Sequence, residues 1–165
     1  MSESYVELLV ARKPSVAMRF LKMLLIMLTV AFVLLLILLP GVVGLFLAAI
    51  AGVGAYFANM YASIEYEYLY VDKEISVDKV LAKSKRKKAG SYTLEQMEIM
   101  APLGSHRLDS YRNRQMKTVD YSSGVAQQPE KRYMMVMNDC RVILEPNETM
   151  LRAIQDVAPR KVFRD

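Results

Sequence analysis

Hydrophobic and polar residues are distributed unevenly along the chain, and one long stretch carries no charge at all. Residues Met23–Ile64 form a run of 42 residues without Asp, Glu, Lys, Arg or His. A helix that spans a bilayer needs about 20 apolar residues, so this run has the length of two spans. Near its middle, Pro40 and Gly41 favour a tight turn, because proline lacks a backbone donor and glycine tolerates turn angles. The pattern predicts a transmembrane helical hairpin.

The hairpin is expected to occupy residues 15–62, with helix 1 at about 16–39, the turn at 40–41 and helix 2 at about 42–61. A single kinked helix would be too long for one bilayer, and a soluble protein of this size could not bury so many apolar residues. Small residues recur in helix 2 at spacings of three and four, which would let helix 1 approach closely. The alternative is that small residues are simply common in membrane helices. The stripe consists of Gly44, Ala48, Ala51, Gly52 and Ala55.

The charges that flank the hairpin predict its orientation. Lys and Arg residues precede the hairpin and follow it between Lys73 and Lys88, whereas the turn carries no charge. Because loops rich in Lys and Arg stay on the cytoplasmic side, we expect a multi-pass plasma-membrane protein with both termini in the cytoplasm. The sequon Asn147-Glu148-Thr149 would then never meet a glycosylation machinery. The basic residues before the hairpin are Arg12, Lys13, Arg19 and Lys22.

Residues 1–14 are expected to form a short cytoplasmic segment before the hairpin. Tyr5–Val10 is rich in strand formers, and Pro14 would end such a strand. The same residues could equally form a short interfacial helix with its leucines in lipid. The sequence leaves both structures open.

After Ile64 the pattern changes to the two-residue period of β-strands. Apolar and polar residues alternate over Ile64–Val71, and Asp72-Lys73-Glu74 follows as a turn. Thr93–Gln96 has the form of a capping box and predicts a short helical turn. We expect a loop or a short strand at 108–114, and a loop from Ser122 to Pro129. Further strands are expected at 75–81, 97–100, 115–121, 132–137 and 140–144, the last two joined by an Asn138-Asp139 turn.

The chain is expected to end with an amphipathic helix at about 147–157. Pro146 and Asn147 open it, Pro159 ends it, and its apolar residues share one face. An antiparallel meander with one apolar face must bury that face, and this helix is the obvious cover. The predicted fold is therefore a two-helix transmembrane hairpin followed by a small antiparallel β domain, residues 64–165, closed by a C-terminal helix. The apolar face consists of Met150, Leu151, Ile154 and Val157.

Composition excludes several classes of function. The net charge of +5 suits a protein beside an anionic leaflet but is too small to argue for nucleic acid. Only one cysteine and one histidine are present, which excludes an intrachain disulfide and a zinc site built from His and Cys. No phosphate-binding glycine loop, paired-carboxylate motif or nucleophile elbow occurs. We expect no enzyme, no cofactor and no metal.

Three isolated features have a chemical interpretation and a structural one. His106 near Asp109 could take part in acid–base chemistry, but a lone histidine in a polar loop is usually just solvated. Cys140 is expected to be a small core residue, since no base lies near it in sequence. A methionine group could form an adaptable binding face, although core packing is the expected use. It consists of Met134, Met135 and Met137.

The strongest local feature is a basic cluster about 20 residues after helix 2. Near an anionic leaflet each such charge contributes on the order of 1 kcal/mol, so the cluster could bind lipid headgroups. The alternative is a solvated loop or an edge strand, in which lysines discourage unwanted strand pairing. Nucleic acid is not expected, because no stacking aromatic residues are interleaved with the charges. The cluster consists of Lys83, Lys85, Arg86, Lys87 and Lys88.

The order of elements resembles a known group of proteins. Two membrane helices, a Tyr-rich strand, a basic cluster, a final hairpin and a helix opened by Pro146 resemble bacterial pleckstrin-homology-like membrane proteins. Their soluble part is a strongly bent antiparallel sheet closed by a C-terminal helix. The whole chain is also similar to a small family of bacterial two-span proteins, a domain of unknown function, in Glu65–Asp72 and Ala158–Phe163. The resemblance implies a fold and no activity.

These observations predict a membrane-anchored cytoplasmic interaction module that lacks catalytic activity. Its partner would be another protein, a second copy of the chain or anionic lipid headgroups. One alternative is an accessory subunit of a larger membrane complex, with the small-residue stripe packed on partner helices. Another alternative is an enzyme whose site the sequence does not reveal.

Overall fold

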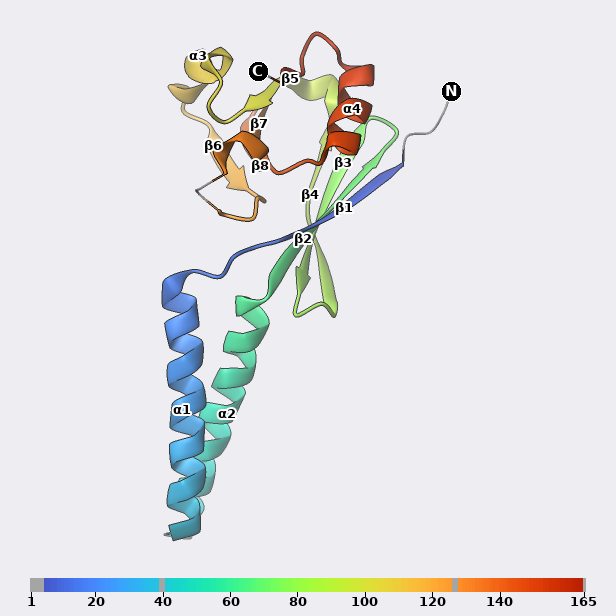
Figure 1. Ribbon diagram of the computed structural model, residues 1–165. Helices are drawn as coiled ribbons and strands as arrows, with labels where there is room; N and C mark the ends of the chain where they lie inside the picture. Colours follow the sequence, from blue (N-terminus) through green and yellow to red (C-terminus); the bar gives the residue numbers. More distant parts are fainter. Residues whose placement is uncertain (1–4, 39–40, 126–127, 165) are drawn as a thin grey trace. The chain divides into compact units, whose positions relative to one another are not determined.

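The structure is a computed structural model that describes residues 5–38, 41–125 and 128–164. The chain divides into two compact units (Figure 1). The helical unit contains residues 13–64 together with 81–85, and the β unit contains the rest of the chain. The β3–β4 turn therefore belongs to the helical unit, although most of both strands lies in the β unit.

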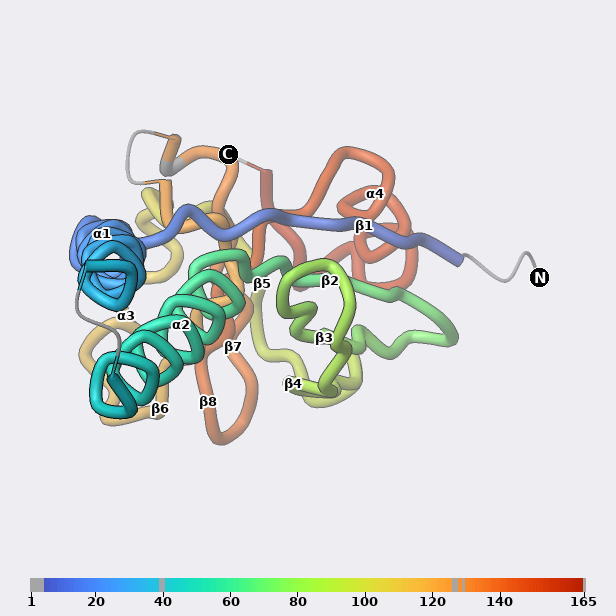
Figure 2. The backbone as a smooth tube through the Cα atoms, turned by 90° about the horizontal axis from the view of Figure 1, so that it is seen from below, coloured from blue at the N-terminus to red at the C-terminus, as the bar shows by residue number. Residues whose placement is uncertain are grey.

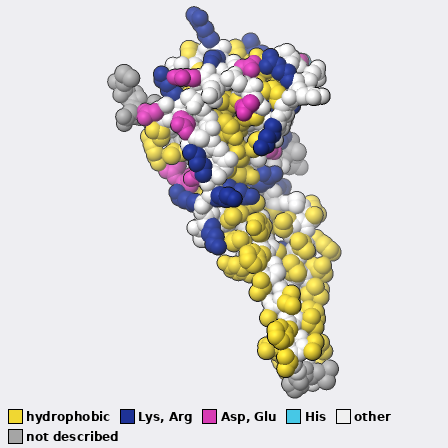
Figure 3. Space-filling view, turned by 180° about the vertical axis from the view of Figure 1, so that it is seen from behind, with side chains coloured by type: hydrophobic (Ala, Val, Ile, Leu, Met, Phe, Trp, Pro, Cys, Tyr) yellow, Lys and Arg dark blue, Asp and Glu magenta, His cyan; other side chains and the backbone are white. Residues whose placement is uncertain are grey.

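The helical unit consists of two antiparallel helices, α1 (Val16–Leu38) and α2 (Val42–Ala62). Ser15 caps α1, where its side-chain Oγ accepts a hydrogen bond from the Met18 amide at 3.2 Å. Both helices are long and apolar enough to cross a membrane, with mean hydropathies of 2.9 and 1.8. Figure 3 shows hydrophobic side chains covering this unit, whereas charged side chains gather over the β unit. Leu39 and Pro40 lie outside the described residues, so the predicted turn is seen only at Gly41, which precedes α2.

The first sheet has the strand order β1-β2-β3-β4. Its first strand is the N-terminal segment, which pairs antiparallel with β2 so that Leu8 lies opposite Tyr68. The segment before the hairpin is thus part of the β unit, and of the two structures left open for Tyr5–Val10 the strand is the one found. The strands are β1 (Val6–Ala11), β2 (Ile64–Val71), β3 (Glu74–Leu81) and β4 (Lys85–Thr93).

Two tight turns connect the last three strands of this sheet. Asp72 and Lys73 both have positive φ angles, 48° and 66°, and so do Ala82 and Lys83, at 49° and 57°. Two consecutive residues with positive φ form the turn whose twist matches that of paired strands. Neither turn contains the glycine that usually marks this geometry. The sequence therefore predicts the turn at Asp72-Lys73 only from its polarity, and it does not predict the turn at Ala82-Lys83.

The second sheet has the strand order β5-β7-β8-β6. β6 runs parallel to β8, so the prediction of a purely antiparallel meander is wrong. The prediction of a loop or strand at 108–114 is also wrong, because a short helix forms there. This segment is held by Arg141, whose guanidinium donates to the backbone oxygens of Tyr111, Arg112, Arg114 and Met116. The elements are β5 (Met97–Pro102), η2 (His106–Leu108), α3 (Asp109–Arg112), β6 (Lys117–Asp120), β7 (Tyr133–Met137) and β8 (Cys140–Leu144).

The last helix, α4 (Glu148–Val157), begins where the sequence predicts. The Asn147 side chain caps it by accepting a hydrogen bond from the Met150 amide at 2.8 Å. Met150, Leu151 and Ile154 are buried, but Val157 is 43 % exposed, so its assignment to the buried face is wrong. α4 packs beside β1 (Figures 1 and 2). Short turns η1 (Leu94–Gln96) and η3 (Pro129–Lys131) complete the fold, and the Thr93 side chain forms no capping hydrogen bond to η1.

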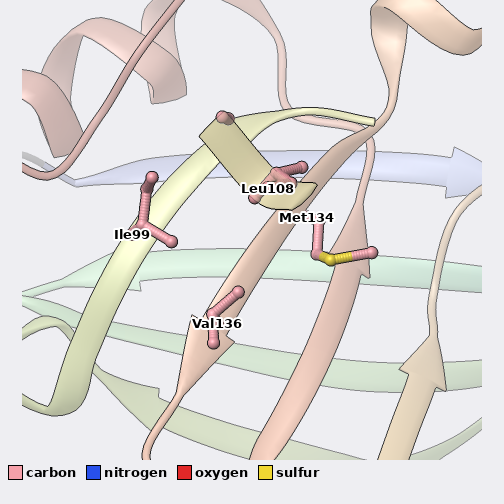
Figure 4. Close-up of a cluster of buried hydrophobic side chains, with 5 residues drawn as sticks. Ile99, Leu108, Met134 and Val136 are labelled. Carbon is pink, nitrogen blue, oxygen red and sulfur yellow. The ribbon is translucent and has the colours of Figure 1, made fainter. Parts of the chain in front are cut away.

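One face of the second sheet is covered by local chain rather than by the first sheet. Ile99, Met134 and Val136 form a buried cluster there with Leu108 from η2 (Figure 4). The C-terminal residues add to this cover, because the Met100 amide donates to Lys161 and the Phe163 amide donates back to Met100. Phe163 also packs against the cluster, and the Arg107 guanidinium lies 4.1 Å from its ring centroid.

Candidate functional site

The basic cluster lies in the β3–β4 turn and at the start of β4, which is an edge strand of the first sheet. All five of its Lys and Arg residues are exposed. Four of the five residues therefore lie on an edge strand, which was one of the two structures considered for the cluster. The first five residues of this strand are all exposed to solvent. A run of charges at a sheet edge prevents pairing with other strands, and it also presents a dense positive surface.

The turn that begins the cluster is bonded to the end of the second helix. The Ala82 amide donates a hydrogen bond to the backbone oxygen of Ser63 at 2.8 Å, and Ser63 is the residue that follows α2. Leu81–Lys85 accordingly belongs to the same compact unit as the two apolar helices. The turn that starts the basic cluster is thus held beside the residue that follows α2.

Arg86 of the basic cluster has a carboxylate partner. Its Nη2 lies 3.2 Å from Oε1 of Glu67, a side chain that is only 7 % exposed, whereas that of Arg86 is 66 % exposed. Burial, together with a hydrogen bond that the protonated Glu67 donates to Glu7, raises the pKa of Glu67. The same hydrogen bond lowers the pKa of Glu7. Within this pair, Glu67 therefore holds its proton more tightly than Glu7 does.

The small-residue stripe of α2 faces α1. A Cβ added at Gly44 would lie 3.4 Å from Leu36, and one at Gly52 would lie 3.8 Å from Thr29. Ala51 is buried, and Ala48 and Ala55 are half-buried in a helix whose other positions are mostly exposed. Gly54, which the sequence reasoning did not include, approaches Leu25 in the same way, at 3.5 Å. The stripe is occupied within the hairpin, and large residues such as Phe46 and Ile50 form the outer face of α2.

The isolated candidates form no catalytic arrangement. His106 is fully exposed and lies 3.3 Å from Asp109, within η2 and the start of α3. Cys140 is half-buried, and burial raises the pKa of its thiol, which disfavours the reactive thiolate. Met134, Met135 and Met137 are buried in β7. Within the part of the chain that the structure describes, no three His, Cys, Asp or Glu side chains are grouped so as to hold a metal ion.

Sequence reasoning missed a buried tyrosine network between the two sheets. Tyr68 donates to the backbone oxygen of Tyr121 at 2.6 Å, and the Tyr92 and Tyr121 hydroxyls lie 3.0 Å apart. Burial raises the pKa of all three tyrosines above the usual value near 10. Arg12, predicted only as a topology signal, donates to the Tyr66 hydroxyl at 2.8 Å and to the backbone oxygen of Asp120. The network joins β1, β2 and β4 to the end of β6.

Comparison with known proteins agrees with this arrangement of two apolar helices, two sheets and a closing helix. No curated protein and no solved structure matches the chain. The family described as "Bacterial PH-like domain (DUF6106)" matches residues 2–164, which includes both helices and the N-terminal strand. This match confirms the resemblance drawn from the sequence. The protein therefore belongs to the DUF6106 family of bacterial PH-like domains, whose function is unknown.

Proposed function

We propose that the protein is a membrane-anchored interaction module whose β3–β4 turn binds anionic lipid headgroups. The helical hairpin spans the plasma membrane, and both termini and the β unit lie in the cytoplasm. The observation that carries this proposal is the hydrogen bond between Ala82 and Ser63, because it fixes the start of the basic cluster at the end of α2. A turn held at the end of a membrane helix meets the headgroup layer, where lysines are attracted to anionic lipids.

The magnitude of this attraction is sufficient to orient a tethered domain. Each lysine near an anionic surface contributes about 1 kcal/mol, so four lysines contribute up to about 4 kcal/mol. Arg86 contributes less, since Glu67 partly neutralises it. The anchor already confines the domain to the membrane, so the headgroup contact selects its orientation and its lipid surroundings. The alternative of an accessory subunit needs the small-residue stripe of α2 to pack on partner helices. That stripe faces α1, so this alternative is less favoured.

Hydrogen exchange on the full-length protein tests the headgroup contact. The protein is reconstituted in nanodiscs of phosphatidylcholine alone or mixed with phosphatidylglycerol, and exchange of the amides at 82–88 is compared. We expect slower exchange in the anionic discs, with the difference shrinking as salt screens the charges. The four substitutions that should abolish it are Lys83→Gln, Lys85→Gln, Lys87→Gln and Lys88→Gln.

A matched variant controls for net charge. It removes four exposed basic residues elsewhere on the β unit and should leave the lipid effect intact. Equal exchange in both kinds of disc, or equal loss of the effect in both variants, would refute the headgroup contact. The orientation is tested separately by protease treatment of inverted membrane vesicles, and a β unit that survives there would overturn it. The control substitutions are Lys73→Gln, Lys117→Gln, Lys131→Gln and Arg160→Gln.

A further inference from the structure

A cleft of about 570 Å³ lies in the β unit between β1 and the beginning of α4. One wall is formed by four consecutive residues of β1, Leu8–Ala11, and the other by Tyr133, Glu145–Glu148 and Leu151. Successive residues of a strand point to opposite faces of its sheet. A cleft that is lined by four consecutive residues is not confined to the side chains of one face, and we place it at the edge of β1.

The outer edge of β1 has no partner strand in the described part of the chain, and α4 packs beside β1. Among the described residues, β2 is the only strand that pairs with β1, and β1 stands at the end of the sheet. In an antiparallel pair, every second residue directs its backbone N–H and C=O away from the partner strand. β1 therefore presents donors and acceptors for one further strand, and the cleft gives that strand room over about four residues, or roughly 13 Å.

The two edge strands of this sheet, β4 and β1, differ in the residues that would discourage pairing with another strand. β4 begins with four consecutive exposed basic residues, Lys85–Lys88, which discourage the addition of another strand. β1 contains neither lysine nor proline, and its Leu9 is 51 % exposed. An exposed edge without such protection is the kind to which an extended peptide adds.

The charges around the cleft indicate which peptide it fits. Among the described residues that line it, three glutamates, Glu130, Glu145 and Glu148, stand against Lys131. Glu148 also contacts Arg164 and lies 4.0 Å from Arg152, so Glu130 and Glu145 provide most of the available negative charge. Complementary charge across such a groove favours a partner with basic side chains.

We propose that this cleft binds an extended, basic segment of a partner protein, which pairs with β1 as a fifth strand of the first sheet. The proposal rests on the proposed function as an interaction module, but it uses the edge opposite the lipid-binding turn. Backbone hydrogen bonds to β1 supply affinity, and the glutamates select lysine or arginine. The hairpin then concentrates the partner segment at the membrane surface.

The test uses full-length protein in nanodiscs of phosphatidylcholine, which removes any dependence on anionic lipid. The probe is a fluorescent six-residue peptide of alternating valine and lysine, and its binding is followed by anisotropy. We expect saturable binding and, in hydrogen exchange, new protection of alternate amides in Val6–Ala11. A peptide of alternating valine and glutamate should not bind. A lysine peptide methylated on alternate backbone nitrogens should not bind either, because it cannot donate to the strand edge.

Two variants of the protein locate the site. Ala11→Trp fills the end of the cleft on β1, and the matched Ala89→Trp places the same side chain at the exposed opposite edge of the sheet. We expect about tenfold weaker binding for Ala11→Trp and Glu130→Lys, and unchanged binding for Ala89→Trp. Near-ultraviolet circular dichroism of the tyrosines verifies that each variant is folded.

Absence of binding to the lysine peptide would overturn the proposal, and so would binding that leaves the β1 amides unprotected. Equal affinity of the Ala11→Trp and Ala89→Trp proteins would also overturn it. These results are independent of the lipid experiment, which changes other residues and reads the exchange of other amides. Failure of one proposal is therefore distinguishable from failure of the other.

Discussion

The two sheets of the β unit differ in how much of their surface is covered. In the first sheet, Tyr66, Tyr68 and Tyr70 of β2 are buried, and the opposite face carries polar residues such as Glu65 and Glu74. In the second sheet, every residue of β7 and most residues of β5 are buried. The first sheet is thus packed on one face, and the second is packed on both. A sheet with one open face shows strict alternation in its sequence, whereas a sheet covered twice shows continuous apolar strands.

The largest loss of stability is expected for substitutions of buried side chains in the second sheet. Met135 is fully buried at the centre of β7. Met135→Ala should lower the free energy of unfolding by about 2–5 kcal/mol, because it removes packed atoms and leaves a cavity. The measurement is chemical unfolding of the full-length protein in detergent micelles, followed by near-ultraviolet circular dichroism.

The matched substitution on the first sheet is Leu9→Ala, on the half-exposed outer face of β1. It should change the free energy of unfolding by no more than about 0.5 kcal/mol. Equal losses for the two variants would show that the second sheet is not the more tightly covered of the two.

The elements that sequence predicts well are those with one dominant local signal. The hairpin follows from a run without charge, and β2 follows from three tyrosines at alternate positions. α4 follows from the cap at Asn147 and an apolar face at helical spacing. The basic cluster is evident for the same reason, since Lys85–Lys88 are adjacent in the chain.

The features that sequence missed or left undecided depend on contacts between distant residues. β1 pairs with β2 across the whole hairpin, with Leu8 opposite Tyr68, so the sequence left the strand as one of two alternatives and did not reveal the cleft beside it. β6 lies parallel to β8 in a region where Arg141 holds the carbonyl oxygens of an earlier segment. No local period reports such contacts. The bond from Ala82 to Ser63, which carries the proposed function, is equally invisible in the sequence.

An intermediate loss of stability is expected for a substitution where the two sheets meet. Tyr68 is fully buried, and its hydroxyl donates to the backbone oxygen of Tyr121 at 2.6 Å. Tyr68→Phe should cost about 1–3 kcal/mol, because it leaves this buried acceptor without its donor. Tyr70→Phe is the matched control on the same face of β2, since within the described residues the Tyr70 hydroxyl has no hydrogen bond. A similar cost for both would mean that ring burial alone, and not the link between the sheets, is responsible.

The smallest expected change in stability concerns Glu67, on the polar face of the first sheet, and it depends on pH. Burial raises the pKa of Glu67 above its ordinary value of 4.5, so the folded state holds this proton more tightly than the unfolded state. Its contribution to stability is therefore complete below pH 4.5 and is lost as the pH rises through the raised pKa. Glu7, whose pKa is lowered, contributes in the opposite sense, and its contribution is lost as the pH falls. Glu67→Gln should remove the decline on the alkaline side, because glutamine stays neutral there.

The measurement is the thermal unfolding midpoint of the full-length protein in nanodiscs between about pH 4 and pH 8. The difference between the Glu67→Gln variant and the wild type should grow in favour of the variant as the pH rises. Loss of the Arg86 partner costs little, because that guanidinium is 66 % exposed. The exposed Glu95 supplies the control, and Glu95→Gln should give a curve parallel to that of the wild type. A parallel curve for Glu67→Gln as well would show that the open face holds no tightly bound proton, and that only its degree of packing distinguishes it from the second sheet.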